Sequence, residues 1–305
     1  MIDLEAVRSL RTVAREGSVS AAAATLGFTP SAVSQQIKRL ERETGVALLE
    51  RVGRGVALTD AGTQLVVGST PILAELERLR SDLQANAPGD GTVSGEVRIA
   101  AFSTVVRGLL APLLVDLART HPDLRLFVRE SEPWETVALI ASGQRDLGIA
   151  HQWGGVALAI PENLVVTPLF TDVADIIVHR DHPLAGRDVL HPRDLADEAW
   201  VATFETTICR QWLRRLFDGV GNAPRVVYES MEFENHLELA RTGAVVALVP
   251  RLGRAPLGPD LVAIPTIDPA STRDVVAVHR RSRTDSPALR ATLSALRERG
   301  AALQT

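Results

Sequence analysis

Residues 28–41, which read FTPSAVSQQIKRLE, combine short hydrogen-bonding side chains and a cation at helical spacing. A turn of about 100° per residue gives this stretch an apolar face, made of Val33, Ile37 and Leu40. The opposite face carries Ser31, Ser34, Gln35 and Lys38. Hydroxyl, amide and ammonium groups can bond to base edges and phosphates in DNA, while the apolar face packs on a protein core. For this helix taken alone, an ordinary solvated polar face is the alternative.

The residues around this stretch predict a helix-turn-helix. Thr29 is suited to cap a helix, and Pro30 fits the first helical position, where its missing N–H costs nothing. An alanine-rich helix is expected over 19–26, with Ser18 as its cap and Gly27 as its left-handed end. Two short helices joined by a tight turn bind DNA through the second helix.

A hairpin is expected after the reader helix. Apolar residues at 48–49 and 56–58 flank Gly53-Arg54-Gly55, so an arginine lies at the tip of a wing. Arg51 and Arg54 are placed to bind phosphates; free surface arginines are the alternative. Ser34 and Gln35 are the expected base contacts. The full set of predicted DNA-binding residues is Ser20, Thr29, Pro30, Ser31, Ser34, Gln35, Lys38, Arg51 and Arg54.

A long helix is expected to follow, opened by Thr59 and Asp60. It carries a stripe of apolar residues with a spacing of three and four: Leu65, Ile72, Leu76, Leu79 and Leu83. That spacing is typical of a coiled-coil seam and predicts a dimer; a helix packed on its own domain is the alternative. Pro71 is awkward inside such a helix, because an interior proline bends it.

From Val93 onward, strands and helices alternate, which predicts parallel α/β structure. Two lobes of similar size, with crossing segments near 165–170 and 264–270, predict a hinged domain with a ligand cleft. Two strand-to-helix turns are expected to face each other there, one at Phe102, Ser103 and Thr104 and the other at 203–207. Hydroxyls and backbone N–H groups at such turns form anion sites, although each hydroxyl could instead be a helix cap. Trp134, His151 and Trp153 are expected on loops at the rim, with ordinary packing as the alternative.

Composition narrows the class of protein. The chain has 305 residues and a net charge of −4, but its first 58 residues are mildly basic and the rest is acidic. Such a basic module can still bind DNA when an oligomer presents several copies. The single cysteine, Cys209, excludes an internal disulfide, and we expect it to be structural. The absence of a long apolar run or an export signal predicts a cytoplasmic protein with no membrane contact.

The order and spacing of several segments resemble the LysR-type transcriptional regulators over nearly the whole chain. The most specific segment is GSVSAAAATLGFTPSAVSQQIKRLERETGVALLERVGRGVALTDAG. Others are HPDLRLFVRE, GQRDLGIA, DHPLA, RDLADEAWV and ARTGAVVALVP. The family's commoner reader helix begins Ser-Gln-Pro and later carries Ser-Arg, where this chain has Thr29-Pro30-Ser31 and Ser34-Gln35. An amide in place of a cation favours adenine over guanine.

The resemblance implies a multidomain protein with three parts. These are an α-rich winged helix-turn-helix domain over 1–58, a linker helix for dimerisation over 59–86, and an effector-binding domain over 87–305. The last has a two-lobe, periplasmic-binding-protein-like α/β fold, with lobes of about 92–164 plus 269–305 and of 165–268.

The resemblance also implies partners. These are double-stranded promoter DNA, a second copy of the chain in a dimer or tetramer, and an unidentified small metabolite that alters the bending of DNA. The implied effector-binding residues are Phe102, Ser103, Thr104, Trp134, Thr203, Phe204, Glu205 and Thr206. If Glu205 points inward, it favours a cationic or hydroxyl-bearing ligand.

No cofactor, metal site or catalytic residue is expected, because none of the familiar enzyme motifs occurs. Two alternatives stay open. A solute-binding protein would share the two-lobe fold, and an architectural DNA-binding protein would ignore metabolites.

Overall fold

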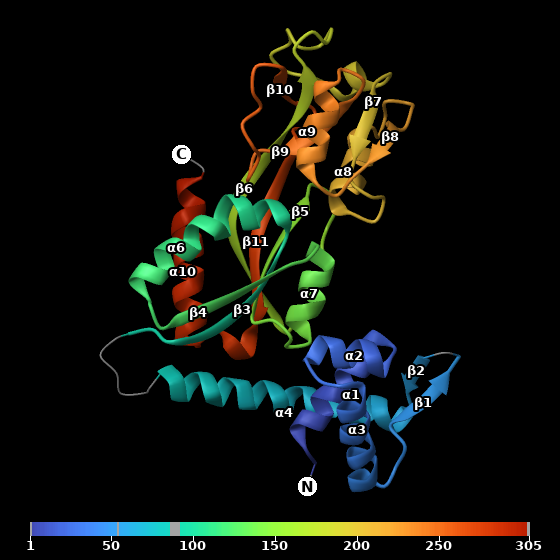
Figure 1. The fold of residues 1–305 in the computed structure, drawn as a ribbon, viewed down its shortest axis with the longest axis vertical. Helices are drawn as coiled ribbons and strands as arrows, with labels where there is room; N and C mark the ends of the chain where they lie inside the picture. Colours follow the sequence, from blue (N-terminus) through green and yellow to red (C-terminus); the bar gives the residue numbers. More distant parts are fainter. Residues whose placement is uncertain (1, 54, 86–91, 304–305) are drawn as a thin grey trace. The chain divides into compact units, whose positions relative to one another are not determined.

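The computed structural model describes residues 2–53, 55–85 and 92–303, and it divides into two compact units. The first unit contains the N-terminal helices α1 (Leu4–Glu16), α2 (Val19–Leu26) and α3 (Pro30–Thr44). Each begins at a residue whose side chain accepts a backbone N–H, namely Asp3, Ser18 and Thr29. Each ends at a glycine in the left-handed conformation, namely Gly17, Gly27 and Gly45. The predicted helix-turn-helix is therefore confirmed (Figure 1).

A two-stranded hairpin and a long helix complete the first unit. Strand β1 (Leu49–Val52) pairs antiparallel with β2 (Gly55–Leu58), which confirms the wing. Helix α4 (Asp60–Ala85) continues through Pro71. Its first half packs on the N-terminal core through Leu65 and Leu73. Leu65 was expected in the dimer seam, but it is half-buried in this core because the first turns of α4 lie against α1 and the wing.

The second unit is built on one mixed sheet. Within the described residues the sheet has nine strands, in the order β4-β3-β5-β11-β6-β9-β7-β8, with β10 paired to β6. Their bounds are β3 Gly95–Ala101, β4 Leu124–Glu130, β5 Leu147–Trp153, β6 Leu164–His179, β7 Ala199–Ala202, β8 Arg225–Glu229, β9 Val246–Pro250, β10 Leu261–Pro265 and β11 Thr272–Arg280. The expected parallel pairing occurs in both lobes, between β3 and its neighbours and between β7 and its neighbours.

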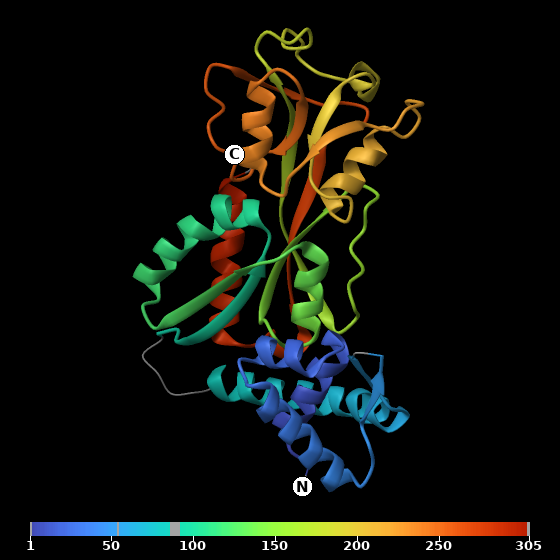
Figure 2. The ribbon, with the colours of Figure 1, turned by 45° about the vertical axis from the view of Figure 1, so that its right-hand side comes forward.

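Helices cover both faces of this sheet (Figures 1 and 2). Their bounds are α5 Ser103–Val105, a π-helical turn Val106–Leu110, α6 Ala111–Thr120, α7 Pro133–Ala141, α8 Ile208–Leu216, α9 Phe233–Arg241 and α10 Pro287–Ala302, with 3-10 turns at Pro192–Leu195 and Arg281–Arg283. The sequence indicated one helix where α5, the π-helical turn and α6 follow each other. A π-helical turn is rare and often marks a functional site.

Strand β6 runs through both lobes. Its first part, as far as Val173, pairs with β11, and its last six residues pair with β9 and β10. The sequence indicated two strands here, over 164–170 and 174–180, where the structure has one continuous strand, so that expectation was wrong. Proline lacks the N–H that a sheet requires, but Pro168 lies beside the register shift between Val275 and Val276, where the ladder tolerates it. The lobe boundaries drawn from the sequence stay predictions.

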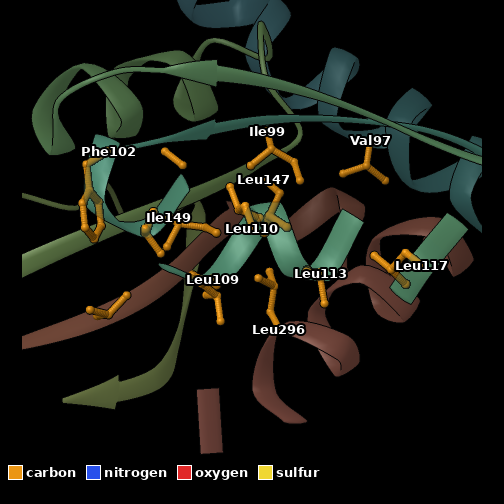
Figure 3. Close-up of a cluster of buried hydrophobic side chains, with 14 of the residues drawn as sticks. Val97, Ile99, Phe102, Leu109, Leu110, Leu113, Leu117, Leu147, Ile149 and Leu296 are labelled. Carbon is orange, nitrogen blue, oxygen red and sulfur yellow. The ribbon is translucent and has the colours of Figure 1, made fainter. Parts of the chain in front are cut away.

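The first lobe has a large apolar core on one face of its strands. Figure 3 shows this cluster, with Leu117 at one end and Phe102 at the other. Phe102 therefore packs in this core. Ser103 and Thr104, which follow it in the chain, lie at the edge of the core. This end of β3 is where the effector was expected.

Candidate DNA interface and effector site

The reader helix α3 has the two faces expected from the sequence. Val33, Ile37 and Leu40 are buried in the N-terminal core. On the opposite face Ser31, Gln35 and Lys38 are exposed and Ser34 is half-buried. The face with hydrogen-bonding groups is thus the one open to a partner. An open groove runs along it, lined in part by Gln35, Lys38 and Arg42.

The neighbouring glutamine, Gln36, has a different role. Its Oε1 accepts a hydrogen bond of 2.6 Å from the Ser9 hydroxyl, which ties α3 to α1. Arg39 is also engaged, since it forms ion pairs with Glu43 at 3.2 Å and Asp3 at 3.6 Å. Arg42, which sequence reasoning did not select, is exposed in the groove and could have been found as the next cation one turn after Lys38.

The other predicted DNA contacts are placed by local structure. Thr29 Oγ1 accepts from Ala32 N at 3.2 Å, so it caps α3 and is exposed at its start beside Pro30. Ser20 is exposed on α2, and Arg51 is exposed on β1 of the wing. Arg54 lies outside the described residues. The roles of these residues as DNA contacts stay predictions.

In the second unit, the first-lobe turn is more closed than expected. Thr104 is 2% exposed, and its Oγ1 accepts a hydrogen bond of 2.7 Å from Arg273 Nη2. The start of α5 has no side-chain cap bond, so the Thr104 hydroxyl is not a helix cap. Ser103 is half-buried, and Phe102 is buried.

The second-lobe turn lies between β7 and α8, as predicted. Thr207 is the cap of α8: its Oγ1 accepts from Arg210 N and donates to Phe204 O at 2.8 Å. Thr203 Oγ1 lies 2.6 Å from Thr207 Oγ1. Because the Thr207 hydrogen is already donated, Thr203 donates this bond and keeps its lone pairs as acceptors. Thr203 is buried, whereas Phe204, Glu205 and Thr206 are exposed.

Three aromatic residues were assigned wrongly to loops. Trp134 is in the first turn of α7 and is 37% exposed. His151 and Trp153 belong to strand β5 and are 2% and 1% exposed. The strand continues past the apolar run because β11 pairs with it as far as Trp153. His151 packs edge-on against Phe102 with ring centroids 4.6 Å apart.

Sequence reasoning missed a buried ion pair next to this turn. Arg273 on β11 is 1% exposed, and its Nη2 lies 2.8 Å from Asp172 Oδ2 on β6. The guanidinium also lies 5.0 Å from the centroid of the Phe102 ring and 5.8 Å from that of Trp153. A charged residue in each of two apolar strands is the signal that could have drawn attention to this pair.

The titratable groups near this pair have altered pKa values. Burial raises the pKa of Glu132, and Glu130 adds to the effect, while Arg273 opposes it. Burial, followed by the charge of Arg273, lowers the pKa of His151 well below its usual range, so the imidazole is neutral. Cys209 as a residue is partly exposed, but burial of its sulfur raises the pKa of the thiol to about 12.

A cavity just large enough for about one water molecule lies beside these residues. Trp153, Thr203, Cys209 and His236 are among the residues that line it. In the described part of the chain, no group of three or more His, Cys, Asp or Glu side chains is arranged to hold a metal ion. No described helix combines the length and the apolar character needed to cross a membrane.

Comparison with known proteins identifies the family of both units. Residues 4–63 match the model of the bacterial regulatory helix-turn-helix protein, lysR family, and residues 90–301 match the LysR substrate binding domain. The uncharacterized HTH-type transcriptional regulator YfeR of Shigella flexneri is 30% identical over 305 residues, covering 98% of this chain and 95% of that protein. The hydrogen peroxide-inducible genes activator of Pectobacterium carotovorum is 28% identical over 250 residues, covering 81% of this chain and 80% of its own.

A solved structure of a full-length OxyR variant from Pseudomonas aeruginosa has the same fold, with a TM-score of 0.72 at 21% identity over 98% of this chain and 95% of that one. Both units, in this order, are those of one family. The chain therefore belongs to the LysR-type transcriptional regulators, DNA-binding proteins that carry an effector-binding domain.

Proposed function

We propose that this regulator reads operator DNA with the exposed face of α3 and the wing, and that a small metabolite in the interlobe cleft controls the binding or bending of that DNA. It acts in the cytoplasm, by binding rather than by catalysis. The observation that carries the proposal is the split of α3 into a buried apolar face and an exposed face with Ser31, Gln35 and Lys38. The effector is held between Ser103 and Thr104 of one lobe and Thr203, Phe204, Glu205 and Thr206 of the other, with Trp134 at the rim.

Self-association is supported by the second half of α4. Ile72, Leu76, Leu79 and Leu83 are between 43% and 66% exposed, and they repeat at alternating intervals of four and three residues. Such a stripe is rarely left in water and fits the same stripe of a second copy. Further exposed apolar residues on α6 and β8, among them Val115 and Tyr228, support a tetramer built from two such dimers.

The test combines a metabolite screen with footprinting on the DNA upstream of the regulator's own gene. At least one metabolite is expected to raise the melting temperature of the full-length protein and to change its footprint. A protein that no metabolite stabilises, with a footprint that no metabolite changes, would be an architectural DNA-binding protein instead.

Replacing Gln35 by alanine should relax the base preference at one position of each half-site. A bidentate amide–adenine contact discriminates by about 1–3 kcal/mol, so one base pair loses roughly 5- to 150-fold in selectivity. Arg51→Ala is the matched comparison: it should weaken binding to all sequences and lower the salt dependence, because a phosphate contact carries no sequence information. Binding to a randomised operator library measures both effects. An unchanged preference in the Gln35 variant would remove this residue from the reading face.

A second candidate function, peroxide sensing by a thiol, follows from the similarity to a hydrogen peroxide-inducible activator. The thiolate is the reactive form of cysteine, and burial of the Cys209 sulfur disfavours it. The chain has no second cysteine with which a disulfide could form within one molecule. We therefore favour a metabolite over peroxide as the signal.

The native Cys209 thiol should accordingly be unreactive. With a pKa of about 12 in place of the ordinary 9.0, the thiolate population at pH 8 falls by roughly 10³-fold. Iodoacetamide should label the native protein correspondingly more slowly than the urea-unfolded protein, as followed by mass spectrometry. Rapid oxidation of Cys209 by peroxide, with a change of footprint that Cys209→Ser abolishes, would instead establish peroxide sensing.

A further inference from the structure

The ion pair between Arg273 and Asp172 is buried at the point where β6 and β11 lie side by side. The two residues are directly opposite each other in the strand register. Their side chains are 1% and 6% exposed. A guanidinium is rarely buried so completely unless its charge is matched and its donors are used. The donors of Arg273 that have no partner therefore indicate what kind of ligand can still bind there.

Asp172 has no capacity left for a ligand. Its Oδ1 accepts from Val173 N at 2.9 Å and from Leu252 N at 3.1 Å. Its Oδ2 accepts from Arg273 Nε at 2.9 Å and lies 2.8 Å from Arg273 Nη2. With three hydrogen bonds and this ion-pair contact, the carboxylate is close to saturated.

Two donors stay without an acceptor in the described part of the chain. Arg273 Nη2 donates to Thr104 Oγ1, but Arg273 Nη1 has no such bond. Thr104 Oγ1 accepts from Arg273, and the hydrogen of its hydroxyl has no acceptor. Both donors belong to side chains that are at most 2% exposed. Arg273 Nη1 is not among the fully buried nitrogens without a partner, so it keeps a small surface open to solvent through which an acceptor can reach it.

Aromatic rings restrict how an acceptor can reach the guanidinium. The ring of Phe102 lies over Arg273 at 5.0 Å and that of Trp153 at 5.8 Å. Guanidinium donors point in the plane of the group, and Asp172 and Thr104 occupy the edge formed by Nε and Nη2. The free edge, on the Nη1 side, is where an acceptor must bind.

The charged and polar neighbours of Arg273 come from both lobes. Arg273 acts electrostatically on Glu132, which follows β4, on His151 of β5, and on Cys209 of α8 in the second lobe. The imidazole of His151 is neutral, and Asp172 already balances the charge of Arg273. The Arg273 guanidinium therefore lies between residues of both lobes, and its unused donor can bind a further acceptor.

We propose that Arg273 is a ligand-binding residue of this regulator, and that its Nη1 and the Thr104 hydroxyl bind the carboxylate of a small acidic effector. The proposal rests on the proposed function and gives its effector a chemical class. A carboxylate satisfies both unpaired donors at once, and bonds from a guanidinium to a carboxylate are the stronger, charge-assisted kind. An ammonium group would leave both donors unpaired and would lie beside a like charge.

The location also explains how an acid could influence the second lobe. Asp172 connects Arg273 to the turn after β9 through Leu252 N. The next residue of that turn, Gly253, is so close to the first lobe that a Cβ there would lie 2.5 Å from Thr104 O. A carboxylate that draws Arg273 or Thr104 toward itself therefore changes a contact that holds the two lobes together.

The test uses the full-length protein and matched pairs of carboxylates and their amides: acetate and acetamide, lactate and lactamide, benzoate and benzamide. Ethylammonium chloride serves as the cation, and sodium chloride controls for ionic strength. Thermal shift and titration calorimetry measure binding. At least one carboxylate should bind at least about 10-fold more tightly than its amide, which is the scale of a charge-assisted hydrogen bond.

Thr104→Val removes the hydroxyl while leaving the ion pair in place, and it should lower the affinity for that carboxylate about 10-fold or more. Thr292→Val is the matched control, because this buried hydroxyl on α10 already donates to Ala288 O at 2.8 Å, away from the cleft. The control variant should bind the carboxylate as the natural protein does.

Equal affinity for carboxylates and amides, binding of the ammonium alone, or an unchanged affinity in the Thr104 variant would overturn the assignment to Arg273. If the carboxylates fail but other metabolites shift both melting and footprint, only this inference is wrong. If no compound of any class has an effect, effector control itself is wrong.

Discussion

Replacing Asp172 by asparagine is expected to lower the free energy of unfolding of the effector-binding domain by about 3–5 kcal/mol, the cost of leaving one partner of a buried ion pair alone. The amide keeps the shape of the carboxylate but not its charge, so Arg273 stays buried without a counterion. The substitution also puts an NH₂ donor either where Oδ1 accepts from Val173 N and Leu252 N, or where Oδ2 accepts from Arg273 Nε and lies 2.8 Å from Nη2. The N–H groups on that side of the side chain then face another donor in place of an acceptor.

Urea unfolding followed by tryptophan fluorescence measures this loss in the intact protein. All four tryptophans lie in the second unit, at positions 134, 153, 200 and 212, so the signal reports that unit. Asp116→Asn is the matched control: this carboxylate pairs with Arg119 and Arg299 but is 45% exposed, and such a pair contributes at most about 1 kcal/mol. Equal midpoints for the two variants would mean that water reaches Arg273 and that the pair is not desolvated.

Much of the fold could be predicted because its signals are local. The caps Ser18 and Thr29 and the glycines that end the helices are adjacent to the elements they bound, so α2 and α3 follow from neighbouring residues. The faces of α3 follow from its period. For the same reason Thr207 was placed in the right turn, although Thr203 and Thr206 were the residues selected for a ligand.

The ion pair could not be predicted in this way. Asp172 and Arg273 are 101 residues apart, and they meet only through the register of β6 with β11. The sequence also divided β6 between residues 170 and 174, which left Asp172 outside both expected strands. A buried charge is recognisable from sequence only once the strand around it is known to be buried.

The same distinction applies to α4, where the sequence shows the stripe but only the structure shows which part of it is free. Leu65 packs on its own domain, whereas Leu76 and Leu79 are 43% and 53% exposed. Two copies of α4 that bury both leucines remove four side chains from water. Fully burying an exposed leucine stabilises by about 1.5–3 kcal/mol, and only about half of each side chain is still exposed, so the pair of helices gains roughly 3–6 kcal/mol from these residues.

The double variant Leu76→Ser/Leu79→Ser should therefore raise the Kd of the α4 dimer by more than about 10²-fold. Because both side chains are already exposed within one chain, folding should be unaffected, and circular dichroism should match that of the natural protein. Arg78→Ser, on an exposed turn facing away from the stripe, is the control and should keep the full assembly. Sedimentation equilibrium would show the loss of mass, and footprinting would show the loss of paired half-site protection, since a single α3 contacts one half-site only. An unchanged mass and footprint in the double variant would show that α4 does not form the dimer and that its leucines serve another partner.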